Sequence, residues 1–192
     1  MESVVDAPMK VRLLHLLWIL PLIALIIYAI WGLVEKKLYP IVYEDIVMEM
    51  AEEYNLEPSL VFAVIRTESK FDKNAVSSAQ AKGLMQITDD TFRWAQKRAN
   101  QEELDSENLF IPRTNIQYGC YIITLLSQQF SDIETVLAAY NAGQGKVSQW
   151  LQDPAYSDDG VTLKHIPYEE TEDYVRRVIN TQKKYQRLYN IL

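Results

Sequence analysis

The longest uninterrupted hydrophobic run lies near the N-terminus. From Leu13 to Val34 the chain carries no Lys, Arg, Asp or Glu for 22 residues. As an α-helix this run would measure about 33 Å, enough to cross the hydrocarbon core of a bilayer. Trp18, Tyr28 and Trp31 lie toward its ends, where amphipathic rings favour the membrane interface. The pattern predicts a transmembrane helix over residues 13–34, preceded by a short tail of residues 1–12.

A cleaved signal peptide is the alternative interpretation of this run. The hydrophobic core of a signal sequence usually spans only about 7 to 15 residues, and the stretch before Glu35 lacks a small-x-small cleavage site. We therefore expect a retained signal anchor. The flanking charges leave its orientation open, because Lys10 and Arg12 on one side balance Lys36 and Lys37 on the other.

After a linker over residues 35–42, residues 43–192 have the usual size of one compact domain. Apolar positions recur there at spacings of three and four, which is typical of helices. The expected helices cover residues 46–54, 58–69, 88–100, a segment starting near Pro112, 133–142 and 169–189. Gly143 and Gly145 are expected to end the fifth, while residues 70–87 and the stretch around 153–160 form loops. The predicted fold class is all-α.

One helix of this set is expected to be central. Residues 60–65 are apolar on every side, as in a helix buried within a domain. Val61, Ile65 and Glu68 then occupy positions i, i+4 and i+7, so the Glu68 carboxyl projects from an apolar face. Desolvation there would raise its pKa toward the range of a proton donor. On spacing alone, however, a solvated helix-end glutamate is the more frequent arrangement.

Composition excludes several kinds of partner. The chain has a net charge of -7 and scattered basic residues, which excludes the basic stripe of a nucleic-acid binder. Cys120 is the single cysteine, so no intramolecular disulfide can form. With only two histidines, His15 and His165, there is no His/Cys cluster at metal-ligand spacing. We expect no metal, no other cofactor and no nucleic acid.

Four ordered motifs between about residues 40 and 190 resemble the soluble lytic transglycosylase (SLT) catalytic domain, a lysozyme-like fold similar to goose-type lysozyme. They are Glu68-Ser69-Lys70-Phe71 with Gly83-Leu84-Met85-Gln86-Ile87, then Asn115-Ile116-Gln117-Tyr118-Gly119, then Ala138-Ala139-Tyr140-Asn141-Ala142-Gly143, and finally Ile166-Pro167 with Tyr174-Val175. One departure is Gln80, where the family usually has Gly in a Ser-x-x-Gly-Ala stretch. Gly admits backbone angles that Gln disfavours, so this position bears on loop conformation and groove shape.

The resemblance implies a role for each matching residue. Glu68 would be the single catalytic acid and then base, with Ser77 hydrogen-bonding near it. Gln86 and Tyr140 would line the cleavage site, and Asn141 and Met85 would shape it around the N-acetyl group of the sugar.

Each of the supporting residues also has a purely structural interpretation. Met85 suits a core filler, Ser77 a turn residue and Asn141 a helix C-cap. Tyr140 lies on an apolar helix face, so a buried core tyrosine is the rival reading.

The implied reaction is non-hydrolytic cleavage of the bond between N-acetylmuramic acid and N-acetylglucosamine in peptidoglycan, which leaves a 1,6-anhydro end. The sequence singles out no second carboxylate; Asp72, Asp89, Glu134, Glu170 and Asp173 are candidates by composition alone. Two alternatives stay open: a hydrolytic muramidase on the same fold, and an inactive membrane-tethered module that binds peptidoglycan. We expect a single-pass protein of the bacterial cell membrane, held by residues 13–34, with its domain on the extracytoplasmic side.

Overall fold

The computed structural model describes residues 9–100 and 103–191, with side chains described from residue 19 onward. The chain divides after Pro40 into two compact units. The first contains α1 (Met9–Leu38), which extends beyond both ends of the predicted span. Within it, Ile19–Leu38 is long and apolar enough to cross a membrane, a property that signal sequences share. Residues 1–8 of the predicted tail lie outside the described residues.

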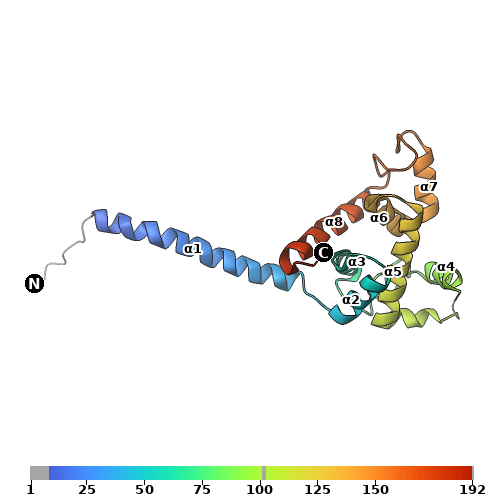
Figure 1. Ribbon diagram of the computed structural model, residues 1–192, viewed down its shortest axis with the longest axis horizontal. Helices are drawn as coiled ribbons and strands as arrows, with labels where there is room; N and C mark the ends of the chain where they lie inside the picture. The colour runs from blue at the N-terminus through green and yellow to red at the C-terminus, as the bar shows by residue number, and fades with distance from the viewer. Residues whose placement is uncertain (1–8, 101–102, 192) are drawn as a thin grey trace, which may run out of the picture. The chain divides into compact units, whose positions relative to one another are not determined.

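The second unit is all-helical, which confirms the predicted fold class (Figure 1). Its helices are α2 (Glu44–Glu53), α3 (Pro58–Ser69), α4 (Asp89–Ala99), the 3-10 helix η1 (Ser106–Phe110), α5 (Pro112–Gln129), α6 (Ile133–Ala142), α7 (Gln144–Gln152) and α8 (Glu169–Tyr189). Two of the starts follow the sequence signals. Pro58 occupies the first turn of α3, and the Thr88 side chain caps α4 by accepting a hydrogen bond from the Thr91 N–H at 3.3 Å.

Helix α3 forms the centre of this unit. Its residues 60–65 are at most 4 % exposed, as their all-round apolar character predicts. α3 packs against α8 and α2, and α8 also packs against α6. Phe62 of α3 stacks on Tyr185 of α8 with ring centroids 5.4 Å apart, which fixes the two helices against each other. The end of α3 is therefore held on a rigid base.

Two elements were not predicted. Gly143 does end α6, but α7 starts at the next residue, because Gly143 takes a φ of +92° and redirects the chain without a loop. α7 then buries Val147, Trp150 and Leu151. The sequence did not predict α7 because Gly145, in its first turn, is a poor helix former and indicates the end of a helix. The other unpredicted element is η1, which lies within the segment joining α4 to α5.

Cys120 lies on α5 and is fully buried. Burial raises the pKa of its thiol well above the ordinary value, so it remains a protonated, small hydrophobic side chain.

Candidate active site

Glu68 lies in the last turn of α3, just before the chain reverses. Lys70 and Phe71 both take positive φ, +54° and +69°, and lead the backbone away from the helix axis. The Glu68 carboxyl is largely desolvated against the domain, which raises its pKa to about 7. The face predicted from the spacing of Val61 and Ile65 is thus the face that Glu68 occupies. A carboxyl group with this pKa can hold a proton at neutral pH and release it in a reaction.

Two residues of α8 act on the same carboxyl. Tyr174 is buried, and its hydroxyl lies close enough to lower the pKa of Glu68, although it falls short of full hydrogen-bond geometry. Arg177, one turn further along, lowers that pKa by its charge. Both effects are smaller than desolvation. Desolvation therefore raises the pKa of Glu68, and the two α8 residues moderate that rise.

Ser69 fixes the loop that follows α3. Its hydroxyl donates to the Leu84 carbonyl at 2.8 Å, and so fastens the end of α3 to the part of the loop that returns past it. Gln86 has a left-handed backbone, φ +49°, and its side-chain amide donates to the carbonyls of Gly83 at 2.8 Å and Ala75 at 3.2 Å. The Gln86 side chain therefore closes the loop over residues 75–87.

Asn115 of α5 holds the same loop from inside the domain. It is fully buried; its Oδ1 accepts from the Met85 N–H at 2.7 Å, and its Nδ2 donates to the carbonyls of Lys82 and Leu109 at 3.0 and 2.8 Å. Gly83 lets these groups approach, because a Cβ there would lie 2.2 Å from the Leu109 carbonyl oxygen. Gly83 also has a φ of +74°. Asn115 belongs to one of the motifs that resemble the SLT domain, but the sequence alone predicts no role for it.

Tyr140 of α6 also bonds to this loop. Its hydroxyl donates to the Met85 carbonyl oxygen at 2.7 Å, and the charge of nearby Glu68 adds to the burial that raises its pKa. Met85 itself is fully buried, and its sulfur lies against Gly119, where a Cβ would approach it to 2.1 Å. In this structure Met85 therefore shapes the site through its backbone and its packing.

Ser77 and Asn141 have their hydrogen bonds elsewhere. The Ser77 hydroxyl accepts from the Ala81 N–H at 3.1 Å within its own turn. The Asn141 Oδ1 accepts from the hydroxyl of buried Thr171 at 2.8 Å and joins α6 to α8, while Gly143 is the C-cap of α6. Gln80 takes a φ of +61°, so the turn keeps a left-handed residue where the resembling family has Gly.

The structure thus brings Glu68, Tyr140 and Tyr174 together. The loop that carries Met85 and Gln86 lies beside them and is bonded to Tyr140. Tyr174 was missed as a site residue because its position on the apolar face of its helix also suits a core tyrosine. A buried tyrosine hydroxyl that lacks a full hydrogen-bond partner and lies beside a desolvated carboxyl indicates a site residue rather than a core tyrosine. This signal can be seen only in the folded structure.

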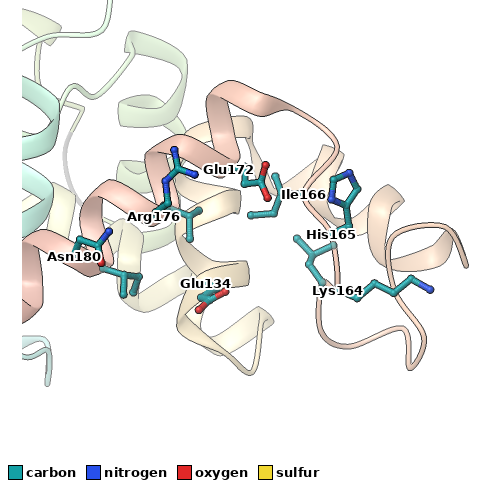
Figure 2. A pocket seen from close by; sticks show the side chains of 10 residues that line it. Glu134, Lys164, His165, Ile166, Glu172, Arg176 and Asn180 are labelled. Atoms are coloured by element: carbon teal, nitrogen blue, oxygen red, sulfur yellow. The ribbon is translucent and has the colours of Figure 1, made fainter.

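A separate cleft of about 280 Å³ lies between α6, α8 and the segment before α8 (Figure 2). Glu134, His165, Glu172 and Arg176 line it, but none of the six predicted site residues does. Arg176 already pairs with Asp173. This cleft lacks the desolvated carboxyl that distinguishes the Glu68 site.

Comparison with known proteins agrees with this geometry. The Transglycosylase SLT domain family matches residues 45–160. The soluble lytic murein transglycosylase of Escherichia coli K12 is 32 % identical over 165 residues, covering 84 % of this chain and 25 % of that protein. The membrane-bound lytic murein transglycosylase C of Serratia proteamaculans is 30 % identical over 171 residues, covering 76 % and 47 %.

Solved structures show the same likeness. The 70 kDa soluble lytic transglycosylase of Escherichia coli superposes with a TM-score of 0.70 at 28 % identity, over 80 % of this chain and 25 % of that one. An inactive mutant of lytic transglycosylase Slt from Pseudomonas aeruginosa gives 0.68, also at 28 % identity and over the same shares of the two chains.

The helical domain, with a largely desolvated Glu68 at the end of its central helix, has the fold of these lytic transglycosylases. The chain belongs to the Transglycosylase SLT domain family. It spans about a quarter of the length of the soluble relatives it matches.

Proposed function

We propose that this protein is a peptidoglycan lytic transglycosylase in which Glu68 serves first as general acid and then as general base. The observation that carries the proposal is the pKa of about 7 on a largely desolvated carboxyl at the end of α3. The relatives named as lytic murein transglycosylases support the substrate, and the family match supports the reaction type.

In the proposed reaction, Glu68 protonates the glycosidic oxygen between N-acetylmuramic acid and N-acetylglucosamine. The resulting carboxylate then takes the proton of the muramic acid 6-hydroxyl, whose oxygen closes onto C1. The product is a 1,6-anhydro sugar, and no water is consumed. Glu68 gives one proton to the leaving sugar in the first step and gains another from the 6-hydroxyl in the second, so it ends in its starting protonation state.

A single carboxylate is consistent with the surroundings of Glu68. The charged group that acts on its pKa is the Arg177 guanidinium rather than a second acid. Of the other candidates, Asp89 pairs with Lys82 at 3.1 Å, and Asp173 pairs with Arg176. Asp72, Glu134 and Glu170 are exposed. The substrate's N-acetyl oxygen can instead stabilise the positive charge at C1, as in substrate-assisted glycosidases.

The supporting residues keep their proposed roles. Gln86 and Tyr140 line the cleavage site, Met85 and Asn141 shape it around the N-acetyl group of the sugar, and Ser77 hydrogen-bonds near Glu68. The hydrogen bonds that join Gln86, Tyr140 and Ser77 to backbone groups, and Asn141 to the Thr171 hydroxyl, favour positioning over proton transfer.

We further propose that α1 is a retained membrane anchor and that the domain, taken as residues 43–192, lies outside the cytoplasm. The apolar helix and the membrane-bound relative from Serratia support this. Protease added to intact spheroplasts is expected to degrade the domain, with a cytoplasmic protein as the protected control. Protection of the domain would contradict the orientation, and a shortened mature N-terminus would contradict retention.

The decisive test of the activity is mass spectrometry of the fragments that the purified full chain releases from cell walls. Anhydro ends are expected. Reducing ends would indicate the hydrolytic muramidase, and no release would indicate a binding module. Glu68→Gln should lose nearly all cleavage, because Gln keeps the size and hydrogen bonding of Glu but cannot cycle a proton. Retention of more than a few per cent of activity would exclude Glu68 as the catalytic acid.

A further inference from the structure

Lys82 ties together the loop over residues 75–87, which we call the 75–87 loop. Its backbone N–H donates to the Ile87 carbonyl at 3.0 Å, and its carbonyl accepts from the Ile87 N–H at 3.1 Å. An antiparallel bridge also pairs it with Val76. The same carbonyl accepts from the Asn115 side chain at 3.0 Å, which fastens the loop to α5. A displacement of Lys82 would therefore move both edges of the loop.

The Lys82 side chain leaves this loop and contacts two other elements. Its ammonium donates to the Ser106 hydroxyl at 2.8 Å, and lies 3.1 Å from an Asp89 carboxylate oxygen and 3.4 Å from one of Glu107. Asp89 is the first residue of α4, while Ser106 and Glu107 begin η1. Only 12 % of the Lys82 side chain is exposed, and the Asp89 oxygen that faces it is buried. One covered cation thus joins the 75–87 loop to α4 and η1.

This cluster differs from an ordinary surface ion pair. Exposed pairs contribute little to stability, because water and salt screen them. Arg113 and Glu49 form such a pair, with more than half of each side chain exposed. Lys82 is covered, and its partners in η1 lie 24 and 25 positions away in the chain. It therefore holds together segments that no single helix or turn connects.

The 75–87 loop needs such a tie because its backbone is strained. Gln80, Gly83 and Gln86 take left-handed φ angles of +61°, +74° and +49°. Glycine adopts such angles freely, whereas a residue with a Cβ does so at a cost. Two glutamines therefore oppose the conformation of this loop. Strained backbone of this kind persists only where fixed partners surround it.

The 75–87 loop borders Glu68 directly. The Leu84 carbonyl accepts at 2.8 Å from the hydroxyl of Ser69, the residue after Glu68. The Met85 carbonyl accepts from the α6 tyrosine on which the charge of Glu68 acts. Leu84 and Met85 follow Lys82 by two and three positions, so the tie at Lys82 limits how far these carbonyls can move. A loosened loop would admit water to the Glu68 carboxyl.

We propose that Lys82 is a positioning residue, whose ammonium binds α4 and η1 and so holds the 75–87 loop closed beside Glu68. Lys82 acts through the loop rather than on the reacting bond, and its effect on turnover rests on the proposed function. The contact with Asp89 raises the pKa of Lys82, so the ammonium keeps its charge across the range in which Glu68 titrates.

The pKa of Glu68 records how well the loop excludes water. In the full chain in detergent, carbon-13 NMR of labelled glutamates measures that pKa, and the signal missing from Glu68→Gln identifies the residue. Lys82→Met keeps an unbranched side chain but removes the charge. It is expected to lower the pKa of Glu68 from about 7 to about 6, because water reaches the carboxyl. Lys82→Arg, which keeps the charge, should restore most of the difference.

The direction of the change separates loop opening from the mere loss of a cation. A nearby positive charge lowers the pKa of a carboxyl, so its loss alone would raise that pKa. The charge that acts on Glu68 directly is that of Arg177, which every variant retains. An unmoved or raised pKa in folded Lys82→Met would overturn the proposal, as would an Arg variant altered as much as the Met variant.

A matched control and a second variant complete the test. Lys164→Met removes an ammonium that pairs with Asp158 before α8, and it should leave the pKa of Glu68 at about 7. If Lys82→Met fails to fold, Ser106→Ala combined with Glu107→Gln removes only the contacts with η1 and keeps Lys82 in place. A smaller fall in the pKa of Glu68 is then expected, and an unmoved pKa would overturn the proposal.

Turnover separates the role of Lys82 from the proposed function. On solubilised glycan strands, Lys82→Met is expected to lower kcat about tenfold while KM stays within about twofold. If the unaltered protein releases no fragments from cell walls but Lys82→Met still lowers the pKa of Glu68, the proposed function fails and the closure of the loop by Lys82 stands. If fragments are released but neither this pKa nor kcat changes in the variant, only the Lys82 proposal fails.

Discussion

The Tyr140 hydroxyl donates to the Met85 carbonyl oxygen at 2.7 Å, across 55 positions of sequence. This bond joins α6 to the loop that returns past Glu68. It also fixes where the phenol proton points, so Tyr140 orients the loop rather than supplying a proton. The Glu68 site is therefore framed by hydrogen bonds to backbone carbonyls.

Tyr140→Phe should reveal this framing role. The change leaves the Met85 carbonyl without its donor, which costs about 1–3 kcal/mol when the group stays buried. We expect a lower melting temperature and a clear loss of kcat, with the pH dependence of activity retained. Disappearance of the alkaline limb of the pH profile would instead make Tyr140 a titrating catalytic group.

Activity should decline above neutral pH. Glu68 must carry a proton at the start of the reaction, and its pKa is about 7. We expect kcat/KM on cell-wall glycan to fall about tenfold per pH unit well above that value. A profile that stays flat to pH 9 would contradict Glu68 as the general acid.

Tyr174→Phe should move the decline of activity above neutral pH to a higher pH. The Tyr174 hydroxyl lowers the pKa of Glu68, so its removal lets the pKa rise. Since this hydroxyl lacks a full hydrogen-bond partner, the fold should lose less than about 1 kcal/mol. The pH–rate profile and a thermal melt measure the two effects. A limb displaced to lower pH would show that Tyr174 acts in another way.

Glu68→Gln should stabilise the fold at alkaline pH. The pKa of Glu68 is raised from 4.5 to about 7, so the folded state loses stability relative to the unfolded chain as pH rises through that interval. The penalty is absent below pH 4.5 and complete above pH 7. The variant should therefore gain about 1–3 kcal/mol at pH 8 and almost nothing at pH 4.

Denaturant unfolding at both pH values would measure the gain in the Gln variant. Glu169→Gln, a change at an exposed glutamate, is the control and should show no such pH-dependent difference. An equal gain at pH 4 and pH 8 would mean that packing, rather than proton affinity, explains the effect.

Asn115 supplies a matched pair of substitutions. Asn115→Asp keeps the size and the bond from the Met85 N–H, but turns a carboxylate oxygen toward the carbonyls of Lys82 and Leu109. We expect it to destabilise the domain by roughly 3 kcal/mol or more at pH 8, because a buried charge then faces two acceptors. Asn115→Ala, which only removes bonds, should cost less at that pH. The opposite order would mean that the loop relaxes around the charge.

The local period of one helix predicted the face that Glu68 occupies, whereas its role as the acid was predicted from the ordered motifs that resemble the SLT domain. The sequence did not predict Tyr174 as a neighbour of Glu68, since their meeting depends on how α3 packs on α8, more than 100 positions away in the chain. Asn115 is similar: its three partners come from a loop and from η1, and no periodic signal links them. The effect of Gln80 on the loop also became clear only in the fold. There Gln80 takes the left-handed backbone conformation that the glycine usual at this position would adopt easily.

The sealed thiol of Cys120 has a practical consequence. Because it is the single cysteine and lies fully buried on α5, a thiol-reactive dye can modify the native domain only when the core opens. The rate of labelling therefore records how often this protein opens, with no engineered probe. In an oxidising compartment the same burial protects the chain from forming mixed disulfides with its neighbours.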